Sequence, residues 1–315
     1  MRRGITDRSS ARDRDARGDA GNASVDSAGL YGPRSEAWRL NREAMLLLGA
    51  GPRSLLLQIA HPLIAEGVDQ HSDFRIDPWA RLTATVRSYL TIVYGSGRQA
   101  RAEIARLNRR HRSVTGPVRD PQAGAISGAR AYSARDPELS LWVHATLVDS
   151  TIVGYDAWIE PLSRARRAAY YEESKPIGRA FGITDDLLPA DLAAFDRYLE
   201  RMMAPRGPVT VTPTARELAQ TILHPSLAPL ARQLVSPLAP ILRRVPAGAY
   251  DWAMWPSLAL LPESIRDGYG IRWTPINRVV AGWLLATWRA WRPLVPPSLR
   301  WFSAASAALD RSAGQ

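Results

Sequence analysis

The chain has 315 residues, of which 46% are apolar and 23% are charged, as is ordinary for a globular protein with a buried core. It contains no cysteine, which excludes disulfides, cysteine-ligated zinc, iron–sulfur clusters, thiolate-ligated haem and a cysteine nucleophile. The formal net charge is +11, but nearly all of the positive charge is arginine, and Lys175 is the only lysine. Because the sequence also has no zinc-finger, RNP or KH signature, nucleic acid is not an expected partner.

One domain is predicted between two tails. Residues 1–27 alternate Arg and Asp with Gly, Ser and Ala and offer almost nothing to bury, so we expect a disordered N-terminal tail. Residues 28–303 form the predicted domain, and residues 304–315 a flexible C-terminal tail. The N-terminus has no apolar signal core and no apolar run reaches the ~18 residues of a membrane span, so a cytoplasmic location is expected.

Apolar residues recur at helical spacing through most of the chain, and proline, glycine and capping residues mark the predicted helix ends. Gly49-Ala-Gly-Pro52 is expected to separate the first two helices, and Pro62 to kink the second one after His61. Residues 121–132 are expected to form a loop, and residues 208–213 show a short alternation typical of a strand. The helices predicted up to residue 223 span residues 35–49, 53–69, 77–94, 99–114, 136–158, 163–181, 189–203 and 212–223.

Prolines dominate the pattern after residue 224. Seven of them within residues 225–262 allow only short helices there. Two further helices are predicted over residues 262–269 and 274–291. Since there is no internal repeat and no sustained strand pattern, the expected fold is all-α, a single multi-helix globular domain.

His111 is the histidine with the most informative position. In the helix predicted over residues 99–114, Ile104, Leu107, His111 and Val114 fall on one apolar stripe, with arginines on the other faces. An imidazole therefore replaces an aliphatic side chain on a buried face, where burial costs free energy unless a partner holds its nitrogens. The pattern leaves two interpretations open, a core histidine bonded to a backbone carbonyl or a ligand.

The preceding helix carries a matching pair, Arg81 and Thr85. They are four residues apart, so both side chains can face one cavity. An arginine beside a buried stripe forms an ordinary salt bridge or neutralises a bound anion such as a propionate or phosphate. His144 is a second buried-imidazole candidate, because the helix predicted over residues 136–158 is apolar almost all round; it is either a ligand or a polar partner.

The remaining histidines and the common catalytic motifs indicate less. His61, at the predicted kink, could be satisfied by a freed backbone carbonyl, and His224 at a helix end is expected to be structural. There is no zincin or di-iron carboxylate motif, no nucleophile elbow and no glycine-rich phosphate loop. A metal site made of two histidines and one carboxylate, a facial triad, is not excluded. Candidates are His61 or His71 with Asp69 or Asp73, and only their closeness in sequence supports it.

A series of motifs in chain order resembles the DUF2236 family, which includes the MpaB-type oxygenases and the latex clearing proteins, or rubber oxygenases. The resemblance covers about residues 35–290 and is more specific for the family than for one reaction within it. The matching motifs are Ala60-His61-Pro62 with Glu66-Gly67-Val68, His71-Ser72 with Phe74, Asp77-Pro78, Arg81-x-x-x-Thr85, Val93-Tyr94-Gly95, His111 before Val114-x-Gly116, Tyr132-x-Ala134-x-Asp136-Pro137, Trp142-Val143-His144-Ala145, Tyr170-Tyr171-x-Glu173 and Leu188-Pro189.

This resemblance implies an all-α domain that encloses a haem b pocket and directs dioxygen to a hydrophobic substrate, lipid-like or isoprenoid. By motif order, His111 corresponds to the residue that ligates the haem iron, with His144 as the alternative. Arg81 and Thr85 correspond to residues that line the haem pocket. Glu66, on the helix next to His61, is a candidate pocket acid.

The resemblance departs from the rubber-cleaving relatives at Ala84. Those relatives carry a lysine at this position, on the distal side of the haem iron, so rubber is not the expected substrate of this chain. The alternative function on the same scaffold is a non-catalytic carrier of haem or of another hydrophobic ligand.

Four tryptophans and four arginines gather in residues 278–302, which contain no acidic residue. Val280, Leu284, Thr287 and Trp291 fall on one helical stripe, which predicts a helix that packs on the bundle. The same composition is typical of an interfacial helix, because tryptophan favours the lipid–water boundary and arginine is attracted to anionic headgroups. Peripheral membrane contact through residues 278–302 is therefore the alternative to core packing.

Overall fold

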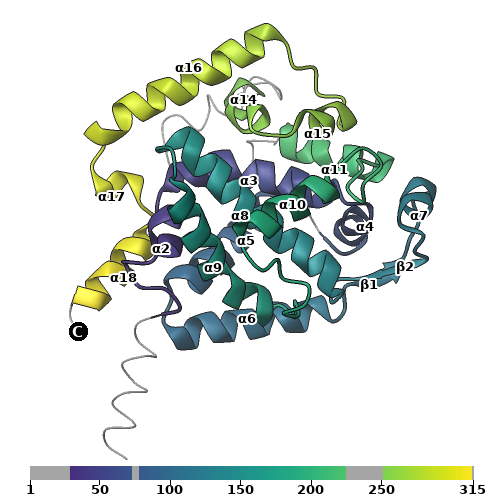
Figure 1. Cartoon of the computed structure of the whole chain (residues 1–315), viewed down its shortest axis with the longest axis horizontal. Helices are drawn as coiled ribbons and strands as arrows, with labels where there is room; N and C mark the ends of the chain where they lie inside the picture. Colours follow the sequence, from purple (N-terminus) through teal and green to yellow (C-terminus); the bar gives the residue numbers. More distant parts are fainter. Residues whose placement is uncertain (1–28, 73–77, 225–250, 314–315) are drawn as a thin grey trace, which may run out of the picture.

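Helices α3 (Ala44–Ile59) and α8 (Pro137–Trp158) lie at the centre of the fold and make its most extensive contact (Figure 1). The computed structural model describes residues 29–72, 78–224 and 251–313. These residues form helices and one two-stranded sheet, which confirms the predicted all-α class. Both central helices are apolar on nearly every side, as expected for helices that have neighbours all round.

Glycines allow the two central helices to approach closely. A Cβ atom on Gly49 of α3 would lie 1.9 Å from Nε1 of Trp158, and a Cβ atom on Gly154 of α8 would lie 2.9 Å from Cδ1 of Leu46. Neither position has room for a side chain. The two glycines therefore set the distance between α3 and α8.

The break predicted at Gly49-Ala-Gly-Pro52 is wrong, because α3 runs unbroken through it. Packing on α8 outweighs the local glycine and proline signals here. One contact across the pair is a hydrogen bond in which Trp142 Nε1 donates to the Leu57 carbonyl at 3.0 Å. The chain does turn before Pro62, where α4 (Pro62–His71) begins as a separate helix.

The helix predicted over residues 35–49 is also divided, at Arg42 and Glu43, between α2 (Glu36–Asn41) and α3. The backbone at this junction pairs with the far end of the chain. The Phe302 N–H donates to the Arg42 carbonyl at 3.0 Å, and Glu43 forms an isolated antiparallel bridge with Trp301. The Arg42 carbonyl thus accepts a hydrogen bond from a residue distant in sequence, and not from a residue one turn further along a continuous helix.

Three charged side chains hold this junction, and we call them the C-terminal clamp: Glu43, Arg292 and Arg300. The Glu43 side chain is 1% exposed, and its Oε1 lies 2.7 Å from Nη2 of Arg292 and 3.8 Å from Nη1 of Arg300. A buried carboxylate needs such counter-charges. The clamp therefore fixes the C-terminal segment against the start of α3.

Helices α5 (Pro78–Tyr94) and α6 (Gly97–His111) form an antiparallel pair joined by a tight turn. Ser96 and Gln99 form a reciprocal capping box that starts α6. Helix α5 is tied to the N-terminal segment, since the Tyr89 hydroxyl donates to Oδ1 of Asn41 at 2.6 Å.

Residues 121–132, predicted as a loop, contain regular structure. Helix α7 (Pro121–Ser127) begins at Asp120, whose carboxylate accepts from two backbone N–H groups, and ends at Gly128, which has a φ of 66°. Strands β1 (Thr115–Pro117) and β2 (Ala131–Ser133) pair on either side of it. No strand forms at residues 208–213, where the alternation had favoured one.

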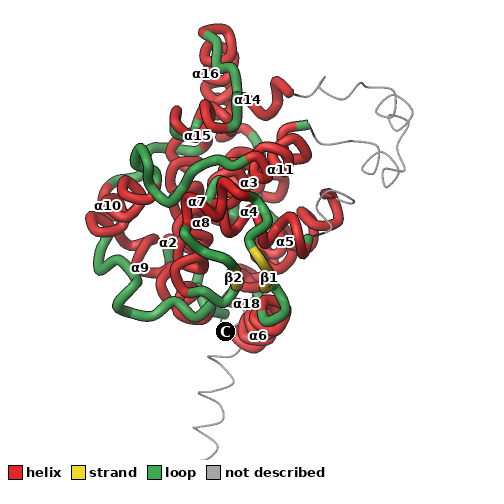
Figure 2. The backbone as a smooth tube through the Cα atoms, turned by 90° about the vertical axis from the view of Figure 1, so that its right-hand side faces the viewer, coloured by secondary structure: helices red, strands yellow, loops and turns green. Residues whose placement is uncertain are grey.

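Figure 2 shows α14 and α16 at one end of the molecule and α6 at the other. The predicted flexible tail at residues 304–315 is instead helical up to residue 313, with Ala305 fully buried among Trp38 and Val93. The prolines of residues 225–250 lie outside the described residues. The remaining elements are α9 (Arg164–Ala180), α10 (Leu192–Met202), α11 (Pro213–Leu223), α14 (Asp251–Ala259), α15 (Glu263–Gly268), α16 (Pro275–Trp291), η2 (Arg292–Leu294), α17 (Pro297–Arg300) and α18 (Ser303–Ala313).

The glycine contact predicts opposite effects of one substitution at two positions of α3. Gly49→Ala should lower the free energy of unfolding by about 1–3 kcal/mol, because the new methyl group overlaps the indole of Trp158. Gly51→Ala should leave it unchanged or raise it by up to about 1 kcal/mol, because its Cβ would meet only Leu47 Cδ1, at 3.4 Å. Urea unfolding followed by circular dichroism measures both, and equal effects would contradict the close approach.

Candidate functional site

The α5–α6 pair brings Arg81 and His111 to the same end. Arg81 lies about 20 Å before the end of α5 and His111 about 21 Å after the start of α6, at 1.5 Å per residue. Because the helices are antiparallel, the two side chains stand opposite each other. The charge of Arg81 accordingly acts on the His111 ring.

His111 is half-buried at the end of α6 and packs against Phe181, with ring centroids 6.2 Å apart. Burial lowers the pKa of its imidazole below the ordinary value, and the neighbouring Arg81 and Arg110 lower it further. These effects favour the neutral form of the ring, which is the form that ligates a metal. Neither ring nitrogen makes a hydrogen bond to a residue in the described part of the chain.

Arg81, Ala84 and Thr85 are exposed on α5. The Thr85 hydroxyl donates to the Arg81 carbonyl at 2.9 Å, so toward any other group it can act only as an acceptor. Ser88, one turn further along the same row, accepts a hydrogen bond from Arg106 Nη2 of α6 at 3.1 Å. Arg81, Thr85 and Ser88 therefore lie along the side of α5 that faces α6. The first two turns of α5 on this side are not covered by the core.

His144 has a different environment in the middle of α8. It is buried, and its Nε2 lies 3.3 Å from the Ser174 hydroxyl of α9. Since that hydroxyl donates its own proton to the Tyr171 carbonyl at 2.7 Å, the imidazole Nε2–H is the donor between the two side chains. Gly178 closes the same side, because a Cβ atom there would lie 3.4 Å from Nε2. Nε2 thus faces α9, and burial lowers the pKa of the ring to about 4.

Glu66 is 2% exposed, and protein donors occupy its carboxylate. Its Oε2 accepts from Nε2 of Gln70 at 2.6 Å and from the backbone N–H of Arg119 at 3.0 Å, and its Oε1 accepts from the N–H of Asp120 at 2.9 Å. The carboxylate anchors the segment that leads into α7. Gln70 also donates to the carbonyl of Pro117 in β1.

His61 is a buried imidazole with an unpaired ring nitrogen, which the sequence did not predict. It is 8% exposed at the N-cap of α4, and its Nδ1 is buried without a hydrogen-bond partner, so the freed carbonyl expected to satisfy it does not. Burial lowers its pKa to about 4, against a smaller opposite effect of Asp136. The Pro62 that follows was the available signal, since proline at the first helical position makes His61 the cap residue.

The facial triad left open by the sequence does not form among the described residues, where no group of three His, Asp or Glu side chains could hold a metal ion. His71 directs Nε2 to the Thr115 carbonyl at 3.0 Å. Asp73 lies outside the described residues.

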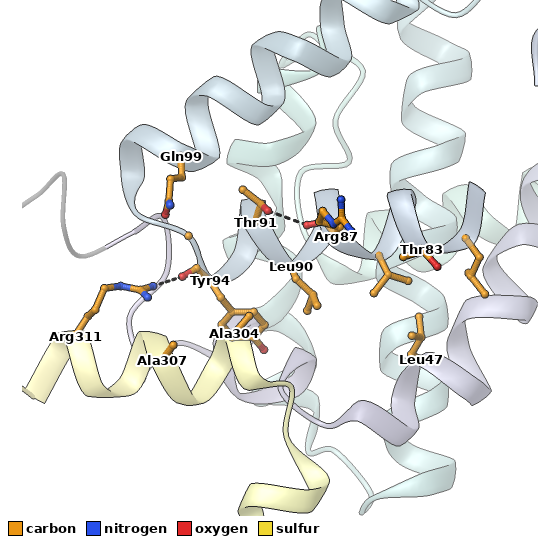
Figure 3. Close-up of a pocket in the computed structure, with 13 residues that line it drawn as sticks. Leu47, Thr83, Arg87, Leu90, Thr91, Tyr94, Gln99, Ala304, Ala307 and Arg311 are labelled. Carbon is orange, nitrogen blue, oxygen red and sulfur yellow. Dashed lines mark hydrogen bonds between the residues drawn. The ribbon is translucent and has the colours of Figure 1, made fainter. Parts of the chain in front are cut away.

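A groove of about 600 Å³ lies between α5 and α18 (Figure 3). Most of its lining is apolar, and Arg87 and Arg311 add positive charge. None of the site residues predicted from the sequence lines it, because the groove uses residues of α5 other than Arg81, Ala84 and Thr85. The lining residues are Leu47, Leu82, Thr83, Val86, Arg87, Leu90, Thr91, Tyr94, Gly95, Gln99, Ala304, Ala307 and Arg311.

A family model for the catalytic domain of ER-bound oxygenase mpaB/B' and rubber oxygenase matches residues 38–295, well over half of the chain. The chain belongs to this family. Uncharacterized proteins Mb2261 of Mycobacterium bovis and Rv2237 of Mycobacterium tuberculosis are each 24% identical to it over 249 residues, which covers 77% of this chain and 88% of the relative. No solved structure matches the chain. The helical domain is thus an oxygenase catalytic domain of the mpaB/rubber oxygenase family.

Within the described residues, no helix of this mpaB/rubber oxygenase domain is long and apolar enough to cross a membrane. The cytoplasmic location and the absence of a nucleic-acid partner expected from the sequence stay predictions.

The buried ring of His144 predicts a loss of stability in weak acid. The unfolded chain binds a proton at the ordinary pKa of 6.5, whereas the folded chain resists protonation until about pH 4. The free energy of unfolding should therefore fall between these pH values, by on the order of 3 kcal/mol from this group.

Urea unfolding at pH 7, 6, 5 and 4 measures this effect. His144→Gln should make the loss smaller, whereas Ser174→Ala, which keeps the imidazole, should retain the wild-type dependence. Parallel curves for wild type and His144→Gln would show that His144 does not cause it.

Proposed function

We propose that this protein is a haem b-dependent oxygenase that acts with dioxygen on a hydrophobic substrate, lipid-like or isoprenoid. One observation carries the proposal. His111 is a half-buried imidazole without a hydrogen bond to any described residue, and burial and the nearby charge of Arg81 lower its pKa and so favour the neutral ring. A haem brings four nitrogen ligands of its own, a neutral histidine is one of the side chains that ligate its iron, and a cation beside its propionates would stabilise their charge. Membership of an oxygenase family supports the reaction class.

His111 is the iron ligand in this proposal, and His144 is not. The Nε2 atom of His144 already faces Ser174 and Gly178 of α9, which leaves no space for a porphyrin on that side. His111 lies instead at the end of the α5–α6 pair, next to the uncovered part of α5.

The residues of α5 would position the cofactor. Arg81 would pair with a propionate through charge-assisted hydrogen bonds. Thr85, whose proton is already donated to the Arg81 carbonyl, would present an acceptor lone pair to the pocket. Ala84, whose side chain is a single methyl group, would leave space for the haem. Bound haem supplies an iron that activates dioxygen, and the protein holds the substrate next to it and excludes water.

Glu66 has no catalytic role in this proposal. Its two carboxylate oxygens hold Gln70 and the backbone of residues 119 and 120, so it has a structural function.

The second candidate function is a carrier of haem or of another hydrophobic ligand, and the apolar groove between α5 and α18 favours it. A visible spectrum of the purified protein tests both functions, because a Soret band typical of b-type haem is expected from either. Oxygen consumption with candidate lipids or isoprenoids separates an oxygenase from a carrier. Absence of a Soret band after reconstitution with haem would overturn the haem proposal.

His111→Ala should abolish the Soret band while circular dichroism shows unchanged helical content, because it would remove the proposed iron ligand from a helix end. His144→Ala is the matched control, since it removes a buried imidazole from α8. It should retain haem even if it lowers stability. The opposite result would assign the iron ligand to His144.

Arg81→Ala should speed the loss of haem to an apomyoglobin scavenger by roughly 10- to 100-fold, the equivalent of a charge-assisted pair worth about 1.5–3 kcal/mol. Arg98→Ala is the control, because Arg98 is an exposed arginine of the paired helix α6 that lines neither the groove nor the candidate haem site. Equal rates for the two variants would remove Arg81 from the pocket.

A further inference from the structure

Helix α16 turns an apolar stripe to the solvent, and we call it the outer face of α16: Ile276, Val279 and Trp283. These side chains are 69%, 69% and 64% exposed. They are spaced by three and four residues and therefore lie on one side of the helix. The exposed apolar surface continues beyond the helix end at Trp291, Leu294 and Leu299.

The opposite side of α16 packs on the protein. Ala281 is fully buried, and Leu285 and Trp288 pack against the main core. The structure thereby corrects the stripe predicted from the sequence, since Trp291, which was assigned to core packing, is exposed. Helix α16 therefore has two apolar sides, one packed on the core and one exposed to water.

The exposure of this surface is a fixed feature of the fold. Thr274 and Asn277 form a capping box at the start of α16. At its other end, the C-terminal clamp holds Arg292 against the buried Glu43. An apolar stripe held outward at both ends is a binding surface rather than a frayed segment.

Positive charge lies on one flank of the stripe. Arg278 and Arg289 are exposed on α16 and form no ion pair with a described residue, and Arg272 precedes the helix. The sequence has no Asp or Glu between residues 268 and 309. The complementary partner is therefore apolar in its interior and anionic at its surface.

A lipid bilayer with anionic headgroups has these two properties, whereas a second copy of the chain does not. A two-fold contact would place the arginines of one α16 against those of the other, without a carboxylate to pair them. We propose that the outer face of α16 docks the protein on an anionic lipid surface. Ile276, Val279 and Trp283 enter the headgroup–acyl boundary, and Arg278 and Arg289 contact lipid phosphates.

Docking would place a helix of about 25 Å in the plane of the membrane, at 1.5 Å per residue. Helix α16 lies at one end of the molecule and α6, which carries His111, at the other (Figures 1 and 2). The docking surface is thus separate from the candidate haem site. It can be tested without haem or substrate, so its failure would not affect the proposed function.

The test is co-sedimentation of the full chain with vesicles of phosphatidylcholine, with or without one third phosphatidylglycerol. Wild type should bind the anionic vesicles at low salt and bind them more weakly at high salt. Val279→Gln/Trp283→Gln should lower the partition coefficient at least tenfold. Arg278→Gln/Arg289→Gln should abolish the preference for the anionic vesicles.

Matched controls lie elsewhere on the surface. Leu147→Gln changes an exposed apolar side chain of α8, and Arg98→Gln/Arg130→Gln removes two exposed arginines; both variants should bind as wild type does. No binding at low salt, or equal binding by Val279→Gln/Trp283→Gln, would overturn the proposal. Dimers in sedimentation velocity that this variant abolishes would also overturn it and assign the face to a second copy.

Because the chain has no cysteine, a single introduced one can report insertion directly. An environment-sensitive dye on Val279→Cys should shift to shorter wavelength when anionic vesicles are added, and the same dye on Leu147→Cys should not. A shift at both positions, or at neither, would contradict docking through α16.

Discussion

The close contact of α3 and α8 is the constraint on which the rest of the structure depends. Gly49 and Gly154 let the two backbones approach, and the other helices surround the pair that results. Arg53 of α3 extends the contact outward, since its guanidinium lies 2.6 Å from Asp149 of α8 and also donates to the carbonyl of Leu260 at 2.7 Å. One buried arginine thus joins the central pair to the segment after α14. Its charge is tolerated because Asp149 and two oxygen acceptors compensate for the lost water.

Local sequence signals predicted the helices that local interactions start. The Asp136-Pro137 pair and Ser163 begin α8 and α9 as expected, because each side-chain oxygen caps a backbone N–H within three residues. The same Asp-Pro signal at Asp120-Pro121 begins α7. The glycines that follow it favoured a loop instead, so the sequence did not predict this helix. The division between α2 and α3 could not be predicted, because it depends on Phe302, which is distant in sequence.

The candidate site was predictable to a similar extent. The apolar stripe of α6 identified His111 as a partly buried imidazole, and the tight turn at Ser96 carries Arg81 of α5 to the same end. The direction of the His144 ring could not be read from α8, which is apolar all round, because it depends on Ser174 of another helix. The backbone donors to Glu66 likewise come from a segment about fifty residues later. Sequence periodicity thus indicates that a polar side chain is buried, and tertiary structure decides what satisfies it.

The C-terminal clamp has a consequence for the order of folding. Glu43 and Arg292 are 249 positions apart, so synthesis delivers the carboxylate early and its counter-charges last. Until these arginines arrive, the α2–α3 junction can bury Glu43 only without its two salt-bridge partners, which is unfavourable. The junction therefore closes late, after the chain has paid the entropy of a very long loop. A chain that terminates before Arg292 lacks both counter-charges of Glu43, so its α2–α3 junction is expected to be more accessible to proteases than that of the finished molecule.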